Sequence, residues 1–495
     1  MILYDWPHGG SDKGEAYYRN LYKDRIDFRE LGRSDAALAA VLDNHGQIDF
    51  QDAQAVKQLT TALLRRDFGL AVDLPDDRLC PPVPSRHTYI LWLKMLLDSS
   101  SSGRATEPLI GLDIGTGASC IYPLLGCVQR PDWCFVATDI DEDSLGCARA
   151  NVRRNQLEDR IRVLPVRTPD DRLIPDETGS RPLSFTMTNP PFYESAAEMT
   201  ASARAKERPP HAVCTGAANE MVTPGGEVAF VGRLLAESVE RHAAGRDVTG
   251  CWYTAMLGKL SSLVAVVEQL RARGIDNYAV TAFVPGSSSK SSKSSKSSKS
   301  KTRRWAIGWS FGGMRPSAEA ARGADHGGGI DAFRHLLPPS PEADVWSVGA
   351  SSSSSSSRPA AIARLANALD AQMHELELSA WTWDRQLLRG VGRARENVWA
   401  RAWRRRKQRA EQEAEAKGNG QTDDHVDNVP APGECAFGFV LSVQVGVAET
   451  VVRCRWIEGH SDVLFQSFCG FLRRKLKETD PTGDDDRMED VSGKQ

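Results

Sequence analysis

The sequence of 495 residues lacks several features that mark particular classes of protein. Its ten cysteines include no Cys-x-x-Cys pair and no Cys/His spacing typical of zinc, so neither a disulfide framework nor a metal centre is indicated. The first residues lack a basic stretch followed by an apolar one, which argues against a signal peptide. No apolar run is long enough to span a membrane. These absences favour a soluble intracellular protein with reduced cysteines.

The formal net charge of -3 does not define a partner, because acidic and basic residues are segregated along the chain. One segregated segment is 287–301, an imperfect Ser-Ser-Lys repeat. It has no apolar side chains to bury, so we expect it to be disordered and positively charged. The hypothesis is that its lysines add phosphate contacts beside the active site. An inert repeat in a tolerant loop is the alternative.

Composition and periodicity divide the chain into segments of different character. The expected segments are a basic flexible N-terminus over 1–26, a helical module over 27–98, an α/β domain over 107–313, a low-complexity linker over 314–358 and a small C-terminal α+β region over 359–495. Within the last region, 385–417 is a helix candidate, 437–445 and 452–456 alternate as strands do, and 461–477 is a closing helix.

The α/β domain is indicated by apolar runs that alternate with stretches of helical periodicity. The strand candidates are 109–114, 134–139, 161–166, 183–188, 252–257, 278–283 and 305–311. Helical stretches between most of them, such as 145–155 and 261–273, predict a doubly wound, mostly parallel sheet. The final two strands have no helix between them. We therefore expect a seven-stranded sheet with an antiparallel pair at one edge.

A glycine turn follows the first strand candidate. Gly115 and Gly117 stand where the strand gives way to a helix, and glycines there let a ligand approach the backbone. Asp139 ends the next strand, where a carboxylate can bind ribose hydroxyls. A nicotinamide-binding turn would have glycine at position 120, but the chain has Cys120. The turn therefore favours S-adenosylmethionine over a dinucleotide.

The most informative stretch is Asn189-Pro190-Pro191-Phe192, directly after the fourth strand candidate. The Asn189 side-chain oxygen and the Pro190 carbonyl can both accept hydrogen bonds from an exocyclic NH2 group. The two prolines preset the backbone that holds these acceptors. Phe192 can stack on the ring that bears the amine, a contact worth about 1–3 kcal/mol. A proline-rich turn after a buried strand is the alternative interpretation of this stretch taken alone.

Together the two motifs resemble the U6 small nuclear RNA adenine-N6 methyltransferase family, also called methyltransferase-like sixteen. The resemblance extends over about residues 19–311 and depends mainly on the stretches 113–126 and 189–192. Shorter similar blocks occur in order at 63–70, 84–90, 256–259 and 304–311. The resemblance implies a class I S-adenosylmethionine-dependent methyltransferase fold with S-adenosyl-L-methionine as cofactor. It also implies a structured RNA with an unpaired adenine, U6 snRNA, as the substrate.

The resemblance assigns roles to individual residues. Asn189 would contact both the cofactor and the target amine, and Asn189, Pro190, Pro191 and Phe192 together form the catalytic element. Arg86 would reach the methionine end of the cofactor. Animal relatives have Glu where this chain has Asp139, and the shorter side chain is still expected to reach the ribose. The candidate cofactor contacts are Arg86, Asp113, Gly115, Gly117, Ser119, Asp139, Thr168 and Asn189, with Asp170 as the alternative to Thr168.

RNA contacts are expected from basic side chains near the N-terminus and in the loop after the Asn-Pro-Pro-Phe element. The candidates are Arg19, Lys23, Arg25, Arg204, Lys206 and Arg208. A stacked base cannot enter the pocket, so the adenine must be splayed out of the RNA. A solvated basic surface is the alternative for each of these residues.

The basic run 404–407 is typical of a nuclear localisation signal or an RNA-binding face. We therefore expect the nucleus, with the cytoplasm as a second location, and neither a membrane nor a metal as partner. Two other functions remain open. An N5-glutamine protein methyltransferase could hold a carboxamide with the same Asn-Pro-Pro element, and a non-catalytic RNA-binding scaffold could retain the pocket.

Overall fold

The structure is a computed structural model, and the chain forms two compact units. The larger unit contains residues 1–312 and 319–338, and the smaller contains 313–318 and 339–495. The residues that the structure describes are 13–101, 107–168, 171–176, 181–204, 216–247, 250–283, 303–323, 331–349, 358–416 and 435–478. The Ser-Ser-Lys repeat over 287–301 lies outside them.

The larger unit is built on a seven-stranded sheet in the order β3-β2-β1-β4-β5-β7-β6. Its strands are β1 (Leu109–Ile114), β2 (Trp133–Asp139), β3 (Ile161–Pro165), β4 (Phe185–Thr188), β5 (Trp252–Leu257), β6 (Tyr278–Phe283) and β7 (Arg304–Trp309). Only β7 runs antiparallel to its neighbours, β5 and β6. The predicted doubly wound sheet with an antiparallel edge pair is therefore confirmed.

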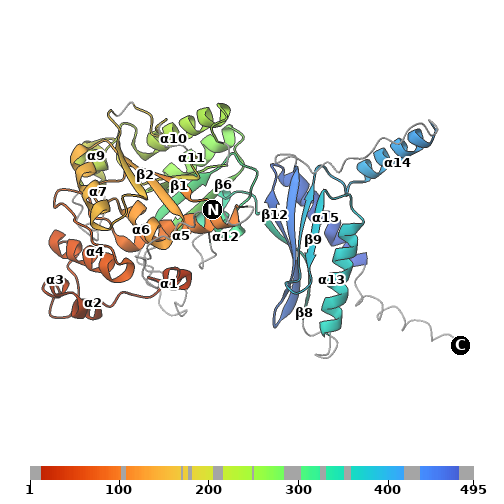
Figure 1. The fold of residues 1–495 in the computed structure, drawn as a ribbon, viewed down its shortest axis with the longest axis horizontal. Helices are drawn as coiled ribbons and strands as arrows, with labels where there is room; N and C mark the ends of the chain where they lie inside the picture. The colour runs from red at the N-terminus through yellow and green to blue at the C-terminus, as the bar shows by residue number, and fades with distance from the viewer. Residues whose placement is uncertain are drawn as a thin grey trace, which may run out of the picture. The chain divides into compact units, whose positions relative to one another are not determined.

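Helices cover both faces of this sheet (Figure 1). On one face lie α5 (Val83–Ser99), α6 (Ile121–Gln129) and α7 (Glu142–Arg154), with α4 (Ala53–Phe68) packed on α5. On the other face lie α10 (Gly226–Ala243) and α11 (Leu260–Ala272). Each face of the sheet has its own hydrophobic core, because successive side chains of a strand point to opposite faces. In β2, for example, Phe135 joins the core beside α6, whereas Val136 joins the core beside α10 and α11.

From residue 13 onward, the N-terminal segment is folded, unlike the flexible tail that its polar composition predicts. It contains α1 (Glu15–Asn20), followed by α2 (Phe28–Ser34) and α3 (Ala36–Ala39). Tyr18 is 2% exposed and stacks on Phe68. The Tyr22 hydroxyl donates a hydrogen bond of 2.7 Å to Asp67. The described part of the segment, from residue 13, is therefore held to α4 by aromatic side chains that sequence composition alone undervalues.

The expected linker over 314–358 is also a wrong prediction, because much of it is folded. It contains α12 (Ala318–Arg322), the 3-10 helix η1 (Asp331–Leu336) and β8 (Glu342–Gly349). All of η1 and all of α12 except Ala318 belong to the larger unit, and β8 belongs to the smaller. Two further short helices, α8 (Ala196–Arg204) and α9 (Ala218–Met221), lie between β4 and α10.

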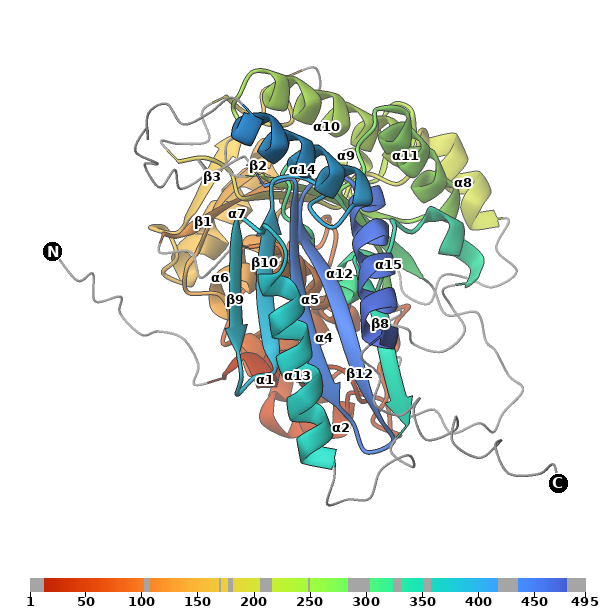
Figure 2. The ribbon, with the colours of Figure 1, turned by 90° about the vertical axis from the view of Figure 1, so that its right-hand side faces the viewer.

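The smaller unit has a five-stranded antiparallel sheet in the order β8-β12-β11-β10-β9. Its other strands are β9 (Ala380–Asp384), β10 (Arg389–Ala394), β11 (Phe437–Val445) and β12 (Glu449–Glu458). The helices are α13 (Arg358–His374), α14 (Arg401–Ala416) and α15 (Asp462–Glu478). Figure 2 shows α13 and α15 lying across one face of this sheet. The predicted helix over 385–417 is wrong in its first part, where the chain forms β10.

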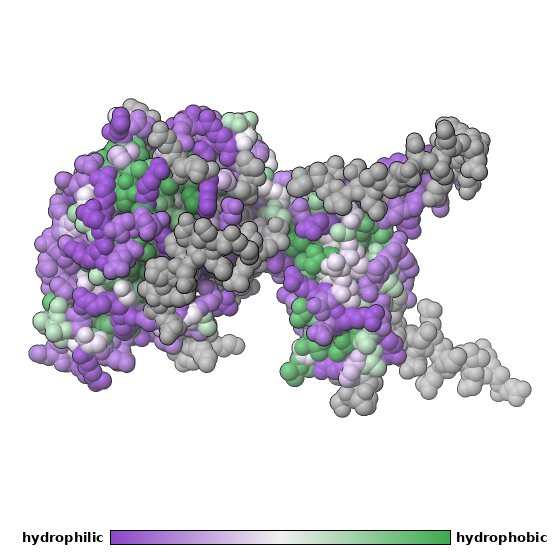
Figure 3. Space-filling view, viewed as in Figure 1, coloured by the Kyte–Doolittle hydropathy of each residue, from purple (hydrophilic) through white to green (hydrophobic). Residues whose placement is uncertain are grey.

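Among the described residues, no helix is both long and apolar enough to cross a bilayer. On the face drawn in Figure 3, hydrophilic residues cover most of the larger unit, and hydrophobic residues show in limited areas between them. The cysteines that the structure describes are free, and Cys120, Cys127, Cys251, Cys454 and Cys469 are buried. They pack as small apolar side chains do.

Candidate active site

The candidate site lies where the strand order reverses, at the carboxyl ends of β1 and β4. These strands are parallel neighbours, and their register pairs Ile114 with Thr188. The next residues, Gly115 and Asn189, therefore leave the sheet side by side. The Thr188 hydroxyl donates a hydrogen bond of 2.8 Å to the Ile114 carbonyl and ties the two ends together. In open α/β sheets, ligands bind at such a reversal of strand order.

The base of the site holds two buried and opposite charges. Asp113 is 0% exposed, and neither of its carboxylate oxygens has a hydrogen-bond partner among the described residues. The Thr116 hydroxyl is directed at Cys120 Sγ, 3.4 Å away. Burial raises the pKa of Asp113 to about 7, an effect that the nearby Thr116 hydroxyl and, more weakly, the positive charge of Arg86 oppose.

Arg86 reaches this base from the first turn of α5. Its Nη1 donates a hydrogen bond of 2.7 Å to the Tyr122 hydroxyl, and its guanidinium lies 5.4 Å from the Tyr122 ring centre. Its Nε is buried and has no partner among the described residues. A buried carboxylate and a buried guanidinium nitrogen, both with hydrogen-bonding capacity left, suit a ligand that carries an ammonium and a carboxylate together.

The glycine turn leaves space above this base. Gly115 and Gly117 have φ angles of 73° and 64°, in the left-handed region that favours glycine. A β-carbon placed on Gly115 would meet no atom within 4 Å. Ser119, also predicted as a cofactor contact, is 6% exposed. The turn therefore presents bare backbone to an open space.

Asp139 stands at the rim of the same turn. Its Oδ2 accepts a hydrogen bond of 2.8 Å from the Gly117 N–H. Its Oδ1 accepts hydrogen bonds of 2.8 and 3.0 Å from the N–H groups of Ile140 and Asp141. Burial raises the pKa of this carboxyl group. Thr168, the candidate contact for the adenine of the cofactor, is exposed in the turn after β3, and Asp170 lies outside the described residues.

The Asn-Pro-Pro-Phe element contains two hydrogen-bond acceptors that have no partner among the described residues. Asn189 Oδ1 is buried without a hydrogen-bond partner among the described residues. The Pro190 carbonyl likewise receives no hydrogen bond from any described group. A buried acceptor without a partner costs about 1–3 kcal/mol, so such groups in a folded protein call for an explanation. A donor on a ligand would satisfy both.

Phe192 is positioned by residues from β5 and β7. A β-carbon on Gly258 would lie 2.9 Å from Phe192 Cδ1, so the bare glycine lets the ring sit against the backbone after β5. The Arg304 guanidinium lies 5.2 Å from the ring centre of Phe192. Burial and the nearby charge of Arg86 lower the pKa of Arg304. Arg304 begins one of the blocks that resemble the family, but it was not predicted as a site residue.

Glu227, at the start of α10, supports this arrangement from below. The side chain is 2% exposed, and its carboxylate accepts hydrogen bonds from the N–H groups of Gly258 at 2.7 Å and Lys259 at 3.0 Å. Lys259 in turn forms an ion pair with Glu198 of α8. The loop after β5 is therefore fixed from two sides.

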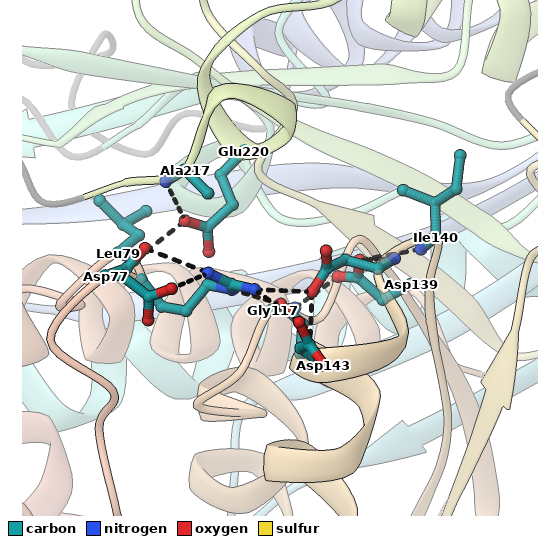
Figure 4. Close-up of polar contacts among 11 residues, drawn as sticks. Asp77, Leu79, Gly117, Asp139, Ile140, Asp143, Ala217 and Glu220 are labelled. Carbon is teal, nitrogen blue, oxygen red and sulfur yellow. Dashed lines mark hydrogen bonds and ion pairs between the residues drawn. The ribbon is translucent and has the colours of Figure 1, made fainter.

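A second group that sequence reasoning missed is centred on Glu220 of α9. Its Oε1 lies close to Gly117, where a β-carbon would be 3.7 Å away, and Figure 4 shows the hydrogen bonds to Ala217 and Leu79 that hold the carboxylate. One oxygen, Oε2, accepts hydrogen bonds from the N–H groups of Leu79 at 3.0 Å and Ala217 at 2.7 Å. Leu79 and Glu220 are 141 positions apart, so no local motif signals the contact.

In the described part of the chain, the residues predicted to contact RNA do not lie together at one site. Arg19, Lys23 and Arg25 are exposed in and just after α1. Arg204 ends α8, and Lys206 and Arg208 lie outside the described residues. Their role in RNA binding stays a prediction.

Comparison with known proteins supports the chemistry of this site. A family model described as RNA methyltransferase matches residues 12–312. The U6 small nuclear RNA (adenine-(43)-N(6))-methyltransferase of Schizosaccharomyces pombe is 33% identical over 434 residues, which are 88% of this chain and 96% of that protein.

The RNA N(6)-adenosine-methyltransferase METTL16 of Homo sapiens is 38% identical over 303 residues, which are 59% of this chain and 50% of that protein. The chain thus matches about half the length of that relative. The crystal structure of the hMettl16 catalytic domain in complex with MAT2A 3'UTR hairpin 1 superimposes with a TM-score of 0.50 and 35% identity, covering 59% of this chain and 94% of that one. By these matches the chain belongs to the RNA methyltransferase family.

Proposed function

We propose that this protein methylates the N6 amine of an unpaired adenine in a structured RNA, with S-adenosyl-L-methionine as the methyl donor. The observation that carries the proposal is the pair of free acceptors, Asn189 Oδ1 and the Pro190 carbonyl, beside the open space at the glycine turn. An exocyclic amine has two hydrogens, and these acceptors supply one partner for each.

The two acceptors address the difficulty of the reaction. The lone pair of an adenine amine is delocalised into the ring, so the nitrogen is a poor nucleophile. Hydrogen bonds to Asn189 and Pro190 draw the two hydrogens out of the ring plane and leave the lone pair directed at the cofactor side. Phe192 holds the base by stacking. Acceleration then comes from positioning, because the displacement needs its reacting atoms in line.

The residues at the base of the site fit the cofactor. The methionine end of S-adenosylmethionine carries an ammonium and a carboxylate, which suit Asp113 and Arg86 respectively. Asp139, which is held beside the glycine turn, is suited to bind the ribose, and Gly115 leaves room for the ligand against the backbone. When bound, the cofactor supplies a methyl group on a sulfonium centre, and the protein supplies orientation.

We further propose U6 small nuclear RNA as the substrate. The Schizosaccharomyces pombe relative, which this chain matches over 96% of its length, is named for adenine 43 of that RNA. The human structure contains an RNA hairpin, which indicates that related sites accept structured RNA. A base inside a duplex is stacked, so the target adenine must be extruded or unpaired before Phe192 can contact it.

Methyl transfer from labelled cofactor to a U6 small nuclear RNA transcript tests the proposal. We expect the label in N6-methyladenosine after digestion of the RNA to nucleosides. Asn189→Ala should lower the rate by about 100-fold or more, since it removes a positioned transition-state contact. Asn44→Ala, in a loop between α3 and α4, is the matched control and should keep the wild-type rate. Label in protein glutamine rather than RNA would contradict the proposal.

Nuclear localisation remains a proposal of its own. The basic run 404–407 lies in α14, where Arg406 pairs with Glu396 and Lys407 pairs with Glu377. Arg404 and Arg405 are exposed. Fluorescence microscopy of the chain with both residues changed to alanine tests it, and an unchanged distribution would count against this run as the signal.

A further inference from the structure

The ribose end of the proposed cofactor site has fewer free acceptors than one carboxylate would suggest. An ionised carboxylate has about four lone-pair positions, two on each oxygen. Asp139 Oδ1 already receives two backbone hydrogen bonds, from Ile140 and Asp141. Asp139 Oδ2 receives one, from Gly117. Only one position on Asp139 therefore remains for a ligand, whereas a ribose brings two hydroxyl groups.

Glu220 supplies the missing acceptor from a different part of the chain. Its Oε2 is occupied by the N–H groups of Leu79 and Ala217, which fix the carboxylate in place. No described group donates to Oε1. A β-carbon placed on Gly117 would lie 3.7 Å from that oxygen, at ordinary van der Waals distance, with nothing else within 4 Å. Oε1 thus faces the turn whose N–H already binds Asp139 (Figure 4).

The two carboxylates both lie against Gly117, Asp139 on its N–H group and Glu220 on the side where a β-carbon would point. Burial raises the pKa of Glu220, and the negative charge of Asp139 adds to this effect. Arg78 offsets part of it, and that side chain also forms ion pairs of 3.2 Å with Asp141 and 3.5 Å with Asp143. Two partly desolvated carboxylates, each with acceptor capacity left, are suited to a ligand with two adjacent hydroxyl donors.

From this arrangement we infer that Glu220 is a second cofactor-binding carboxylate, which accepts one ribose hydroxyl of the cofactor at Oε1 while Asp139 Oδ2 accepts the other. The inference rests on the proposed use of S-adenosylmethionine. It makes α9 part of the cofactor site, because Glu220 joins that helix to Leu79.

Binding of S-adenosylhomocysteine and of its 2′-deoxy and 3′-deoxy analogues, measured by titration calorimetry on the full chain without RNA, tests the inference. For the wild type, we expect both analogues to bind about tenfold more weakly than the parent, since each loses a hydrogen bond to a charged acceptor. In Glu220→Gln, one analogue should bind less than about threefold more weakly than S-adenosylhomocysteine. The other analogue should show the same loss of affinity, relative to S-adenosylhomocysteine, as in the wild type.

Comparing analogues within one variant removes any general effect of the substitution on the site. Gln keeps an oxygen for the Leu79 and Ala217 N–H groups, so the loop is expected to stay folded. Glu142→Gln, an exposed change at the start of α7, is the matched control and should leave both losses as in the wild type.

The outcomes separate this inference from the proposed function. A wild type that binds S-adenosylhomocysteine but tolerates the removal of either hydroxyl overturns the inference, even if Glu220→Gln does not fold. Equal losses in the wild type and Glu220→Gln overturn it as well. Both results leave the proposed function standing. Failure of the wild type to bind S-adenosylhomocysteine would instead overturn the proposed function and the inference with it.

Discussion

At the scale of single residues, the site keeps charged and polar groups in a buried state that the protein alone does not satisfy. The charges of Asp113 and Arg86 interact at the base of the site, but the two side chains form no direct ion pair. Removal of either partner of such a buried pair is costly, yet the pair itself contributes little to stability. The arrangement is better explained by a ligand that binds both groups at once.

The raised pKa of Asp113 gives the ligand affinity a specific dependence on pH. An ammonium group binds the ionised carboxylate, and with a pKa of about 7 the free protein holds a proton on Asp113 at pH 6. That proton must leave before the ligand binds. S-adenosylhomocysteine should therefore bind about tenfold more weakly at pH 6 than at pH 8. Calorimetric titrations at the two pH values measure the difference.

Asp113→Asn is the control for this dependence. The variant has no titrating group at that position, so its weaker binding should be nearly the same at pH 6 and pH 8. An unaltered pH dependence in Asp113→Asn would assign the effect to another group.

The residue scale also shows which site members sequence alone can identify. Asn189 and Asp139 were predicted because Asn189 directly follows a recognisable strand and Asp139 ends one. Glu220 and Arg304 were missed for a physical reason. Their contacts with Leu79 and Phe192 exist only after distant segments pack together.

At the scale of elements, the position of the Phe192 ring depends on how closely the loop after β5 approaches the loop after β4. The side chain of Glu227 draws the N–H groups of Gly258 and Lys259 towards the start of α10. Because Gly258 has no side chain, Phe192 can lie directly against it. Gly258→Ala should push the ring aside, since its β-carbon would be 2.9 Å from Phe192 Cδ1.

We expect Gly258→Ala to reduce methyl transfer to RNA by about tenfold or more, because displacement of a positioning group by a fraction of an ångström misaligns the base. Affinity for S-adenosylhomocysteine should stay unchanged, because the Phe192 ring does not line the part of the site that contains Asp113 and Arg86. Transfer rates and calorimetric affinities measured on the same preparation check both parts.

Gly146→Ala in α7 is a matched glycine change. A β-carbon there would meet no atom within 4 Å, so this variant should transfer methyl groups at the wild-type rate and be more stable by about 1 kcal/mol. Wild-type transfer by Gly258→Ala would show that the ring needs no such close approach.

The same scale explains which elements could be predicted. Most strands of the seven-stranded sheet are buried on both faces, so they stand out as mainly apolar runs. In the smaller unit, β10 was mistaken for helix because Arg-rich sequence surrounds it. Its glycines are there for packing, since a β-carbon on Gly390 would lie 2.1 Å from the Trp381 ring and one on Gly392 would lie 2.3 Å from the Phe439 ring. The periodicity of the sequence does not predict these contacts.

At the scale of the whole molecule, the two units are interleaved along the chain. Residues 319–338 return to the larger unit after 313–318 have joined the smaller one. The described parts of this segment, 319–323 and 331–338, contain side chains that are packed in the larger unit. The Trp92 indole N–H donates a hydrogen bond of 2.9 Å to the Ala320 carbonyl, and Phe333 and Leu336 are 2% and 1% exposed. A boundary placed at 313 from composition therefore cuts through a folded unit.

This arrangement predicts that a chain ending at 338 is more stable than a chain ending at 312. The longer chain buries Phe333, Leu336 and Leu337 and keeps the hydrogen bond of 3.1 Å from the Tyr278 hydroxyl to the Leu336 carbonyl. Each large apolar side chain contributes about 1.5–3 kcal/mol when buried, so the difference should be roughly 4 kcal/mol or more. Thermal unfolding followed by circular dichroism should show it as a midpoint lower by about 10 °C in the shorter chain. Equal midpoints for the two chains would mean that 319–338 does not belong to the larger unit.

Because the smaller unit has a core of its own, removal of 339–495 should leave the midpoint of the larger unit close to its value in the full chain.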